Sequence, residues 1–225
     1  MIPLTERLWK DNSSVYAEIV AHPFITGLVD GTLGAHQFGH YVAQDAHYLY
    51  DYARALMVIG AKAPTSEDVA MFARHAADTI EVELALRTTT LPSLGVDPVT
   101  VAVSLPSTRA YTDHLLAVAT TGTFADGLAA ILPCYVIYAR LGSDLIDLPI
   151  GNPLYREWVD TYADTRFVKA VHDVTAVADR VGVSLNPEDE NRAHAHYAAS
   201  ARYEWRFWDA AYRGEQPSTD HTGSP

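Results

Sequence analysis

Apolar residues recur along this chain at intervals of three and four positions, with polar residues between them. This spacing gathers apolar side chains on one face of an α-helix, and no segment shows the alternation typical of a half-buried strand. The pattern predicts helices near residues 3–20, 35–62, 64–87, 108–121, 124–143, 154–162, 167–182 and 187–212. We therefore expect an all-α bundle of seven or eight helices.

Breaks rich in proline and glycine separate these predicted helices. Residues 91–95 and 148–153 are of this kind. Residues 186–189 are typical of a helix start, with an asparagine cap, a proline in the first turn and two acids near the positive end of the helix. No linker-like stretch divides the chain, so we expect one domain over residues 1–213. Residues 214–225 have turn-forming composition and no apolar face, and they predict a disordered tail.

The charge and the distribution of apolar residues argue against several classes of function. The formal net charge is −12 and no basic cluster is present, which argues against nucleic acid or an anionic membrane as a partner. The first ten residues lack the apolar core of a signal peptide, and no apolar run is expected to reach the roughly 18 residues that span a bilayer. A single cysteine and the missing export signal predict a cytoplasmic protein.

The single cysteine, Cys134, lies in an apolar helical run. It cannot form an internal disulfide, so any special role must belong to the thiol. Pro133 removes a backbone donor and is expected to bend the helix there, and Tyr138, four residues on, shares a face with the sulfur. Free cysteines usually behave as small buried hydrophobic residues. This segment by itself therefore leaves two interpretations open, a packing residue and a catalytic thiol.

A carboxylate lies between two phenols in the helix predicted over residues 35–62. Asp45 follows Tyr41 by four positions and precedes Tyr48 by three, so the three share one face. This arrangement suits an inward-facing acid that forms hydrogen bonds. The alternative is a surface acid beside partly buried tyrosines, and the spacing does not separate the two.

A second acid, Glu204, shares a stripe with Phe207 and Trp208 in the last predicted helix. Burial on an aromatic face would raise its pKa and suit general acid chemistry. The alternative is a glutamate at the edge of the stripe, paired with an arginine. Tyr111 and Tyr162 are further phenols near helix ends. Aromatic rings with two carboxylates would fit a flat nitrogen heterocycle, although sequence spacing does not show that these helices converge.

Six segments, taken in order, resemble the TenA family (thiaminase II, aminopyrimidine aminohydrolase), in the branch with a catalytic cysteine. They are residues 22–24, 30–33, 41–48, 132–135, 155–162 and 203–212. Each motif is weak by itself, but the ordered set is specific and is colinear from about residue 5 to residue 213. The resemblance implies an all-helical haem-oxygenase-like fold, a homotetramer with each active site within one subunit, a small aminopyrimidine as substrate, and no cofactor.

The resemblance also implies roles for individual residues. Cys134 would be the nucleophile and Glu204 its acid/base partner, while Asp45 would bind the amino group and a ring nitrogen of the pyrimidine. Tyr48, Tyr111, Tyr138 and Tyr162 would line or orient the site, and Phe207 would pack near the ring. Three positions depart from the family pattern, namely His47, Arg87 and Val136. They leave the catalytic set intact and bear on substrate preference.

The implied reaction is the hydrolytic deamination of 4-amino-5-aminomethyl-2-methylpyrimidine. A thiolate adds to ring carbon C6 and a proton is delivered to N1. The 4-amino nitrogen then expels ammonia from the methylene group, water adds to the exocyclic alkene, and the thiolate leaves. An unperturbed thiol is only a few per cent ionised near pH 7, so it needs a neighbouring base or phenol network. With thiamin, the thiazolium would be the leaving group.

Two other function classes are compatible with parts of the sequence. A metal-dependent oxidase on the same fold could draw ligands from acids and histidines of the chain, namely Asp45, His75, Asp78, Glu81, Glu83 and His114. The relevant helices carry no Glu-x-x-His pair of the kind found in carboxylate-bridged bundles, so we expect no metal. A non-catalytic thiamin-binding or regulatory protein is the other alternative. Such a protein needs no nucleophile, which favours the enzyme.

Overall fold

The computed structural model describes residues 2–96 and 102–217, and every regular element in this part of the chain is helical. The elements are α1 (Leu4–Val20), α2 (Pro23–Asp30), α3 (Ala35–Gly60), α4 (Ser66–Ala85), the π-helical turn η1 (Leu86–Thr90), α5 (Leu91–Ser93), α6 (Pro106–Thr121), α7 (Phe124–Leu145), α8 (Pro153–Ala163), α9 (Thr165–Gly182) and α10 (Pro187–Arg213). The all-α prediction is confirmed.

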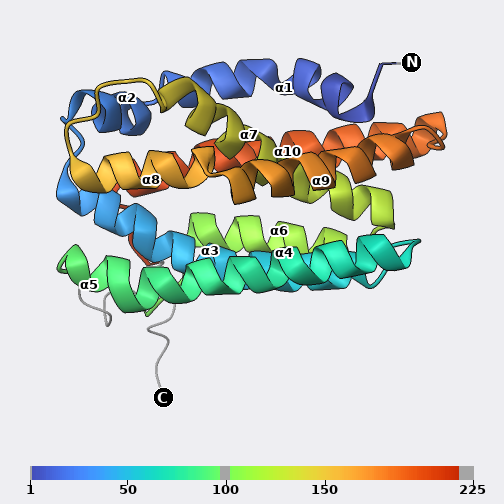
Figure 1. Cartoon of the computed structure of the whole chain (residues 1–225), viewed down its shortest axis with the longest axis horizontal. Coiled ribbons are helices and arrows are strands. Elements are labelled where there is room, and N and C mark those ends of the chain that lie inside the picture. Colours follow the sequence, from blue (N-terminus) through green and yellow to red (C-terminus); the bar gives the residue numbers. More distant parts are fainter. Residues whose placement is uncertain (1, 97–101, 218–225) are drawn as a thin grey trace, which may run out of the picture.

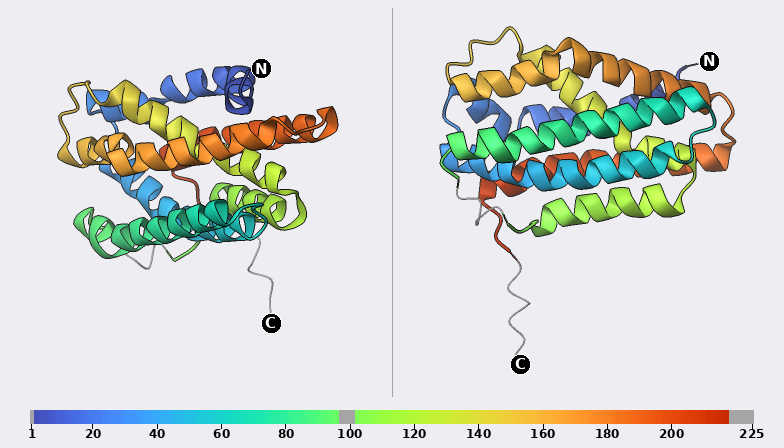
Figure 2. Two further views of the ribbon diagram at one scale, coloured as in Figure 1. Left: turned by 45° about the vertical axis from the view of Figure 1, so that its right-hand side comes forward. Right: turned by 60° about the horizontal axis from the view of Figure 1, so that its bottom comes forward.

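The helices lie in layers (Figure 1). Helix α3 packs against α4 and α6 on one side of the bundle, and α10 packs against α7. Helices α8 and α9 follow each other almost end to end, and α7 crosses the bundle obliquely between the α1 side and the α3 side (Figures 1 and 2). The core is continuous from α1 to α10 and is rich in tyrosine as well as aliphatic side chains.

The described residues form nine continuous helices rather than the expected seven or eight, since α4, η1 and α5 run on without a break. The missed element is α2. Its ends are well specified, because the ring of His22 accepts a hydrogen bond from the Phe24 backbone N–H, Pro23 occupies the first turn, and Gly31 adopts a left-handed conformation after the last residue. Eight residues are too few to establish a helical period, which is why the apolar pattern did not reveal it.

The helix expected to end near Arg87 instead continues to Ser93. It does so through the π-helical turn η1, where the Leu91 backbone N–H bonds to the Leu86 carbonyl. Three threonines in this turn are β-branched and disfavour a regular α-helix, and Pro92 follows with no N–H to donate. The low helix propensity of these residues, which predicted a helix end, therefore produces a π-helical turn within one longer continuous helix.

Helix α7 is more apolar than expected. By length and composition it meets the test for a membrane-spanning segment, contrary to the expectation that no run would. However, 72% of its most apolar window is buried inside the protein, so its composition is that of a central core helix. Pro133 lies inside this helix, which remains continuous from Phe124 to Leu145.

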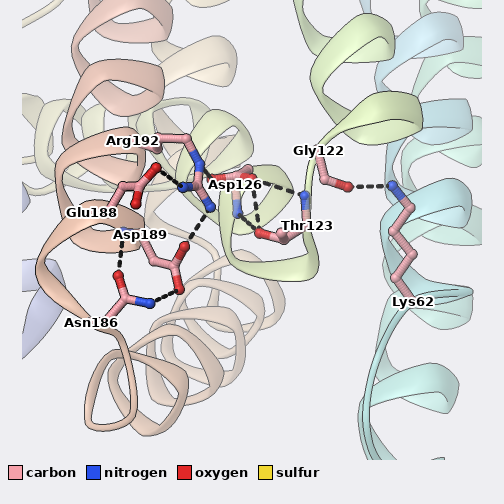
Figure 3. Close-up of polar contacts among 8 residues, drawn as sticks. All are labelled: Lys62, Gly122, Thr123, Asp126, Asn186, Glu188, Asp189 and Arg192. Carbon is pink, nitrogen blue, oxygen red and sulfur yellow. Dashed lines mark hydrogen bonds and ion pairs between the residues drawn. The ribbon is translucent and has the colours of Figure 1, made fainter.

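A cluster of polar residues lies at the ends of several helices, and we call it the distal network (Figure 3). It consists of Lys62, Gly122, Thr123, Asp126, Asn186, Glu188, Asp189 and Arg192. Thr123 and Asp126 form a reciprocal capping box at the start of α7. Arg192 of α10 lies with its Nε 3.4 Å from Asp126 Oδ1, and Lys62 donates to the Gly122 carbonyl at the end of α6. The network thus joins α3, α6, α7 and α10.

The segment after α10 is described as far as residue 217. The Glu215 carboxylate accepts hydrogen bonds from the backbone N–H and hydroxyl of Ser107, at 3.0 and 2.8 Å. Its backbone carbonyl lies 3.0 Å from His40 Nε2. These contacts hold the first residues of the segment at the start of α6. Residues 218–225 of the tail predicted to be disordered lie outside the described residues.

Candidate active site

Eight residues predicted from the sequence come from five helices. They are Asp45 and Tyr48 of α3, Tyr111 of α6, Cys134 and Tyr138 of α7, Tyr162 of α8, and Glu204 and Phe207 of α10. Helical spacing places the members from each helix on one face, since they are three or four positions apart. The tertiary structure then brings the five faces together, as the contacts below show.

The aromatic members form a wall of two packed groups that Tyr41 of α3 connects, since its ring lies 5.6 Å from that of Phe207 and its hydroxyl 3.0 Å from that of Tyr138. The ring centroid of Tyr48 lies 5.0 Å from that of Tyr111 and 5.8 Å from that of Phe207. The Tyr138 ring lies 4.6 Å from the Tyr162 ring. These distances are typical of packed aromatic pairs. All eight residues therefore belong to one region, with the carboxyl groups and the thiol among the rings.

Glu204 is the more deeply buried of the two acids, with 1% of its surface exposed. The Tyr111 hydroxyl donates a 2.7 Å hydrogen bond to its Oε1. Desolvation raises the pKa of Glu204 to about 8, and the negative charge of Asp45 adds to the rise, while the hydrogen bond from Tyr111 opposes it. Within the described chain no arginine, lysine or histidine pairs with Glu204. The interpretation of Glu204 as an edge residue paired with an arginine is therefore wrong.

Asp45 faces the interior, with 8% of its surface exposed. Desolvation raises its pKa to about 7, and it forms no salt bridge with any residue that the structure describes. It is therefore not a surface acid. Asp45 and Glu204 influence each other electrostatically, because the charge of Asp45 raises the pKa of Glu204. Two neighbouring acids with different raised pKa values are suited to hold one proton and one charge near neutral pH.

Cys134 is partly buried and its thiol is free. Desolvation raises the pKa of the thiol well above its usual value, the charge of Glu204 raises it further, and the nearby Tyr48 phenol acts in the opposite direction. The sulfur is therefore a protonated thiol at neutral pH when nothing is bound. It becomes nucleophilic only if its proton moves to a neighbouring base as it attacks, and Glu204 and Asp45 are the bases whose charges reach it.

Four aromatic residues of this region were absent from the predicted set. Trp208 donates from Nε1 to the Tyr138 hydroxyl at 3.1 Å, and the Tyr41 hydroxyl lies 3.0 Å from the same oxygen. The Tyr52 ring stacks on Tyr48 at 5.3 Å. Trp158 contacts the Tyr162 ring at 5.0 Å. A signal existed for all four, since each lies four positions from a predicted site residue on the same helix.

Two buried polar atoms in this region have no hydrogen-bond partner among residues 2–96 and 102–217. They are the Tyr48 hydroxyl and Trp158 Nε1. Buried polar groups are normally satisfied, and exceptions call for an explanation such as a ligand. The Tyr48 hydroxyl lies beside the reactive groups, because it interacts with the Cys134 thiol and with Tyr111 and acts to lower the pKa of both.

Three of the residues that could have served as metal ligands each contact a different partner. His75 Nδ1 lies 3.0 Å from the Tyr135 hydroxyl, Glu83 pairs with Arg87 one turn on, and His114 packs against the Tyr203 ring. In the described ranges, no group of three or more His, Cys, Asp or Glu side chains could hold a metal ion. Arg87, one of the three positions that differ from the family pattern, is thus paired with Glu83 on the same helix.

Comparison with known proteins places these observations in context. The chain matches the model of the TENA/THI-4/PQQC family over residues 9–214. It is 33% identical over 196 residues to a Bacillus subtilis protein named aminopyrimidine aminohydrolase, covering 86% of this chain and 83% of that protein. It is also 35% identical over 211 residues to the thiamine biosynthesis multifunctional protein ThiED of Corynebacterium efficiens. That match covers 94% of this chain but only 28% of the larger protein.

Solved structures agree with the fold. A TenA homologue from P. horikoshii OT3 superposes with a TM-score of 0.84 at 29% identity, covering 95% of this chain and 100% of the other. A domain with a heme oxygenase-like fold from Shewanella denitrificans gives a TM-score of 0.75 at 18% identity, covering all of both chains, and it shows the fold alone. The predicted haem-oxygenase-like fold is confirmed.

Proposed function

Because this chain belongs to the TENA/THI-4/PQQC family, we propose that it is an aminopyrimidine aminohydrolase that works by cysteine catalysis. Its substrate would be 4-amino-5-aminomethyl-2-methylpyrimidine and its products the 5-hydroxymethyl pyrimidine and ammonia. The observation that carries the proposal is the meeting of one thiol and two carboxyl groups inside an aromatic wall. Cys134, Glu204 and Asp45 come from three different helices and lie within one another's electrostatic influence.

The protonation states support the assignment of roles. With a pKa of about 8, Glu204 holds a proton at neutral pH and is able to deliver it to ring nitrogen N1. The pKa of Asp45, about 7, is the lower of the two, so Asp45 is the acid that ionises first and is able to accept a hydrogen bond from the 4-amino group as a carboxylate. One acid thus serves as donor and the other as acceptor, and a flat ring with an amino group and ring nitrogens matches that pair.

The chemical steps follow from these roles. The Cys134 sulfur forms a bond to C6 as N1 takes a proton from Glu204, and the thiol proton returns to the carboxylate. Electrons from the 4-amino nitrogen then move through C4 and C5 and break the bond from the methylene carbon to its protonated amine, which leaves as ammonia. Water adds its hydroxyl to the exocyclic alkene and gives its remaining proton to the ammonia. N1 then loses its proton, the bond from C6 to sulfur breaks with its electron pair returning to sulfur, and the proton from N1 restores the thiol. The net reaction consumes one water and releases one ammonia.

The Cys134→Ser variant tests this proposal. Serine is nearly isosteric with cysteine, but its hydroxyl is far less ionised at neutral pH, so ammonia release should nearly vanish. The fold should persist, and the aminopyrimidine should still bind because Asp45 and the aromatic wall remain. Ammonia release and ligand binding would be measured on the same preparation, with circular dichroism as the control for folding.

Alkylation of the wild-type protein gives a second arm of this test. An alkylating reagent should inactivate the protein through Cys134, the sole cysteine of the chain. The hydroxymethylpyrimidine product should slow that inactivation by covering the sulfur. If Cys134→Ser retains wild-type turnover, the sulfur is a packing residue and the proposed mechanism is wrong.

A further inference from the structure

Helix α7 approaches the end of α8 unusually closely at Gly142. A Cβ atom at this position would lie 2.7 Å from both the carbonyl carbon and the carbonyl oxygen of Tyr162, and 3.0 Å from the backbone nitrogen of Ala163. Ordinary van der Waals contact begins near 3.4 Å, so an added methyl group would require a separation of about 0.7 Å more. The obstruction is backbone, which is unable to rotate out of the way.

The backbone met at Gly142 carries a residue of the site. Tyr162 is the penultimate residue of α8, and Asp164 directly after the helix caps α9 through a hydrogen bond to the Arg166 backbone N–H. The corner between α8 and α9 is therefore held on its α9 side by that cap and on its α7 side by the contact with Gly142. These two contacts restrict movement of the Tyr162 backbone.

The same helix α7 supplies the ring that Tyr162 packs against. Tyr138 lies one turn before Gly142, and its ring centroid is 4.6 Å from that of Tyr162. Cys134 lies one turn earlier still. Cys134, Tyr138 and Gly142 thus occupy one face of α7 at four-residue spacing, the first with the thiol, the second with a phenol of the wall, and the third with an empty position that admits the α8 backbone.

We propose that Gly142 is a positioning residue that sets the distance of Tyr162 from the thiol by admitting the end of α8 against α7. The contact with the substrate would be made by Tyr162 and not by Gly142. The expected effect of Gly142 on turnover rests on the function proposed above, whereas its effect on the position of Tyr162 does not. The position of Tyr162 and the turnover are therefore measured separately.

The chain offers a matched control in Gly127. It also lies inside α7 and is buried, and a Cβ atom there would lie 2.7 Å from its nearest obstacle. That obstacle is Cγ1 of Ile59, a side-chain atom of α3 and not backbone of α8, so an added methyl group there would press on Ile59 and not on the Tyr162 backbone. Gly127 precedes Cys134 by seven positions and Gly142 follows it by eight. Both substitutions to alanine remove a helix-interior glycine, so both gain helix propensity to a similar degree.

The first measurement reports the position of Tyr162 without any substrate. Protein labelled with 3-fluorotyrosine would be studied by fluorine NMR, with the Tyr162 and Tyr138 resonances assigned from Tyr162→Phe and Tyr138→Phe. Gly142→Ala should shift both resonances. Tyr155, at the other end of α8 with its hydroxyl bonded to the Leu33 carbonyl, should keep its resonance. Gly127→Ala should leave all three in place.

The second measurement is turnover. A misplacement of this size in a catalytic site costs on the order of 10- to 100-fold, so Gly142→Ala should lower kcat/KM for the aminopyrimidine by that factor. Gly127→Ala should retain the wild-type value. If the wild type releases no ammonia, the proposed function fails, and the NMR comparison still decides whether Gly142 places Tyr162.

Three outcomes would overturn the inference. An unmoved Tyr162 resonance in Gly142→Ala would show that the added methyl group is accommodated elsewhere. A moved resonance with unchanged kcat/KM in an active enzyme would show that the position of Tyr162 is irrelevant to turnover. A Gly142→Ala protein that fails to fold while Gly127→Ala folds would make the contact a requirement of the fold rather than of the site.

Discussion

The candidate active site and the distal network shift the pKa values of their buried carboxyl groups in opposite directions. Asp126 of the distal network is 3% exposed, which is close to the 1% of Glu204 in the site. Burial alone would raise the pKa of Asp126, but hydrogen bonds from Thr123 and the charge of Arg192 outweigh it and hold the pKa below its usual value. Glu204 has one phenol as partner and no cation, and its pKa rises to about 8.

Helix α10 takes part in both regions. Arg192 and Glu204 are twelve positions apart along it, which corresponds to about 18 Å at the rise of an α-helix. At its start, side chains cap helix ends and neutralise charge, which favours folding. In its second half, the acid Glu204 is desolvated with one phenol as its partner and no cation, which costs stability above about pH 4.5 and produces a proton donor near neutral pH. Partner groups, rather than burial, therefore decide whether a carboxyl group of this protein supports the fold or the chemistry.

The largest expected effect is that of Glu204→Gln on turnover. Glutamine keeps the shape and the Tyr111 contact but has no proton to transfer, so ammonia release should fall by roughly 10²-fold or more. Stability should barely change below about pH 4.5, because Glu204 is neutral there in both the folded protein and the unfolded chain, and above that pH the variant should become progressively more stable than wild type. Steady-state kinetics and urea denaturation on the same samples would measure both. Loss of folding with unchanged turnover per folded molecule would make Glu204 a structural residue.

A smaller effect of the reverse kind is expected in the distal network. Asp126→Ala removes the capping box of α7 and leaves Arg192 without its buried partner. We expect a loss of about 2 kcal/mol in the free energy of unfolding, with kcat/KM unchanged.

Glu188→Ala is the matched control for that variant. Glu188 also approaches Arg192, at 3.9 Å, but its side chain is 88% exposed, so removing it should change stability by less than about 0.5 kcal/mol. Equal effects of the two variants, measured by urea denaturation, would show that burial and capping of Asp126 contribute nothing.

The smallest effect is a pH dependence that separates the two regions. The pKa of Glu204 is raised from 4.5 to about 8 on folding, so its contribution to stability is fully present below about pH 4.5 and is lost as the pH rises through about 8. Wild type should therefore lose about 1 kcal/mol relative to Glu204→Gln between pH 7 and 8.

The difference between wild type and Asp126→Ala should stay constant over the same interval. The folded pKa of Asp126 is lowered, so its contribution is lost only as the pH falls below the ordinary range of aspartate. Urea denaturation at the two pH values tests both statements. A wild-type curve parallel to that of Glu204→Gln would mean that Glu204 ionises in the folded protein as easily as in the unfolded chain.

Much of the fold was accessible from the sequence, because long amphipathic helices and their caps are local features. The start of α10 at Asn186 and Pro187 was predicted from its cap and first turn, and the structure confirms it. The short helix α2 and the π-helical turn before Leu91 were not predicted. Both depend on one or two particular contacts rather than on a repeated pattern.

The chain by itself determined which chemical groups share a helix face, since i to i+4 spacing is fixed by helix geometry. It placed Tyr138 beside Cys134 and Phe207 beside Glu204. The packing of the helices brings these faces together, lets Tyr111 of α6 donate to Glu204 of α10, and seats the backbone of Tyr162 against Gly142. Helical spacing does not predict these features, because pKa values and close approaches depend on desolvation and on contacts between distant segments. Those contacts exist only once the helices have packed.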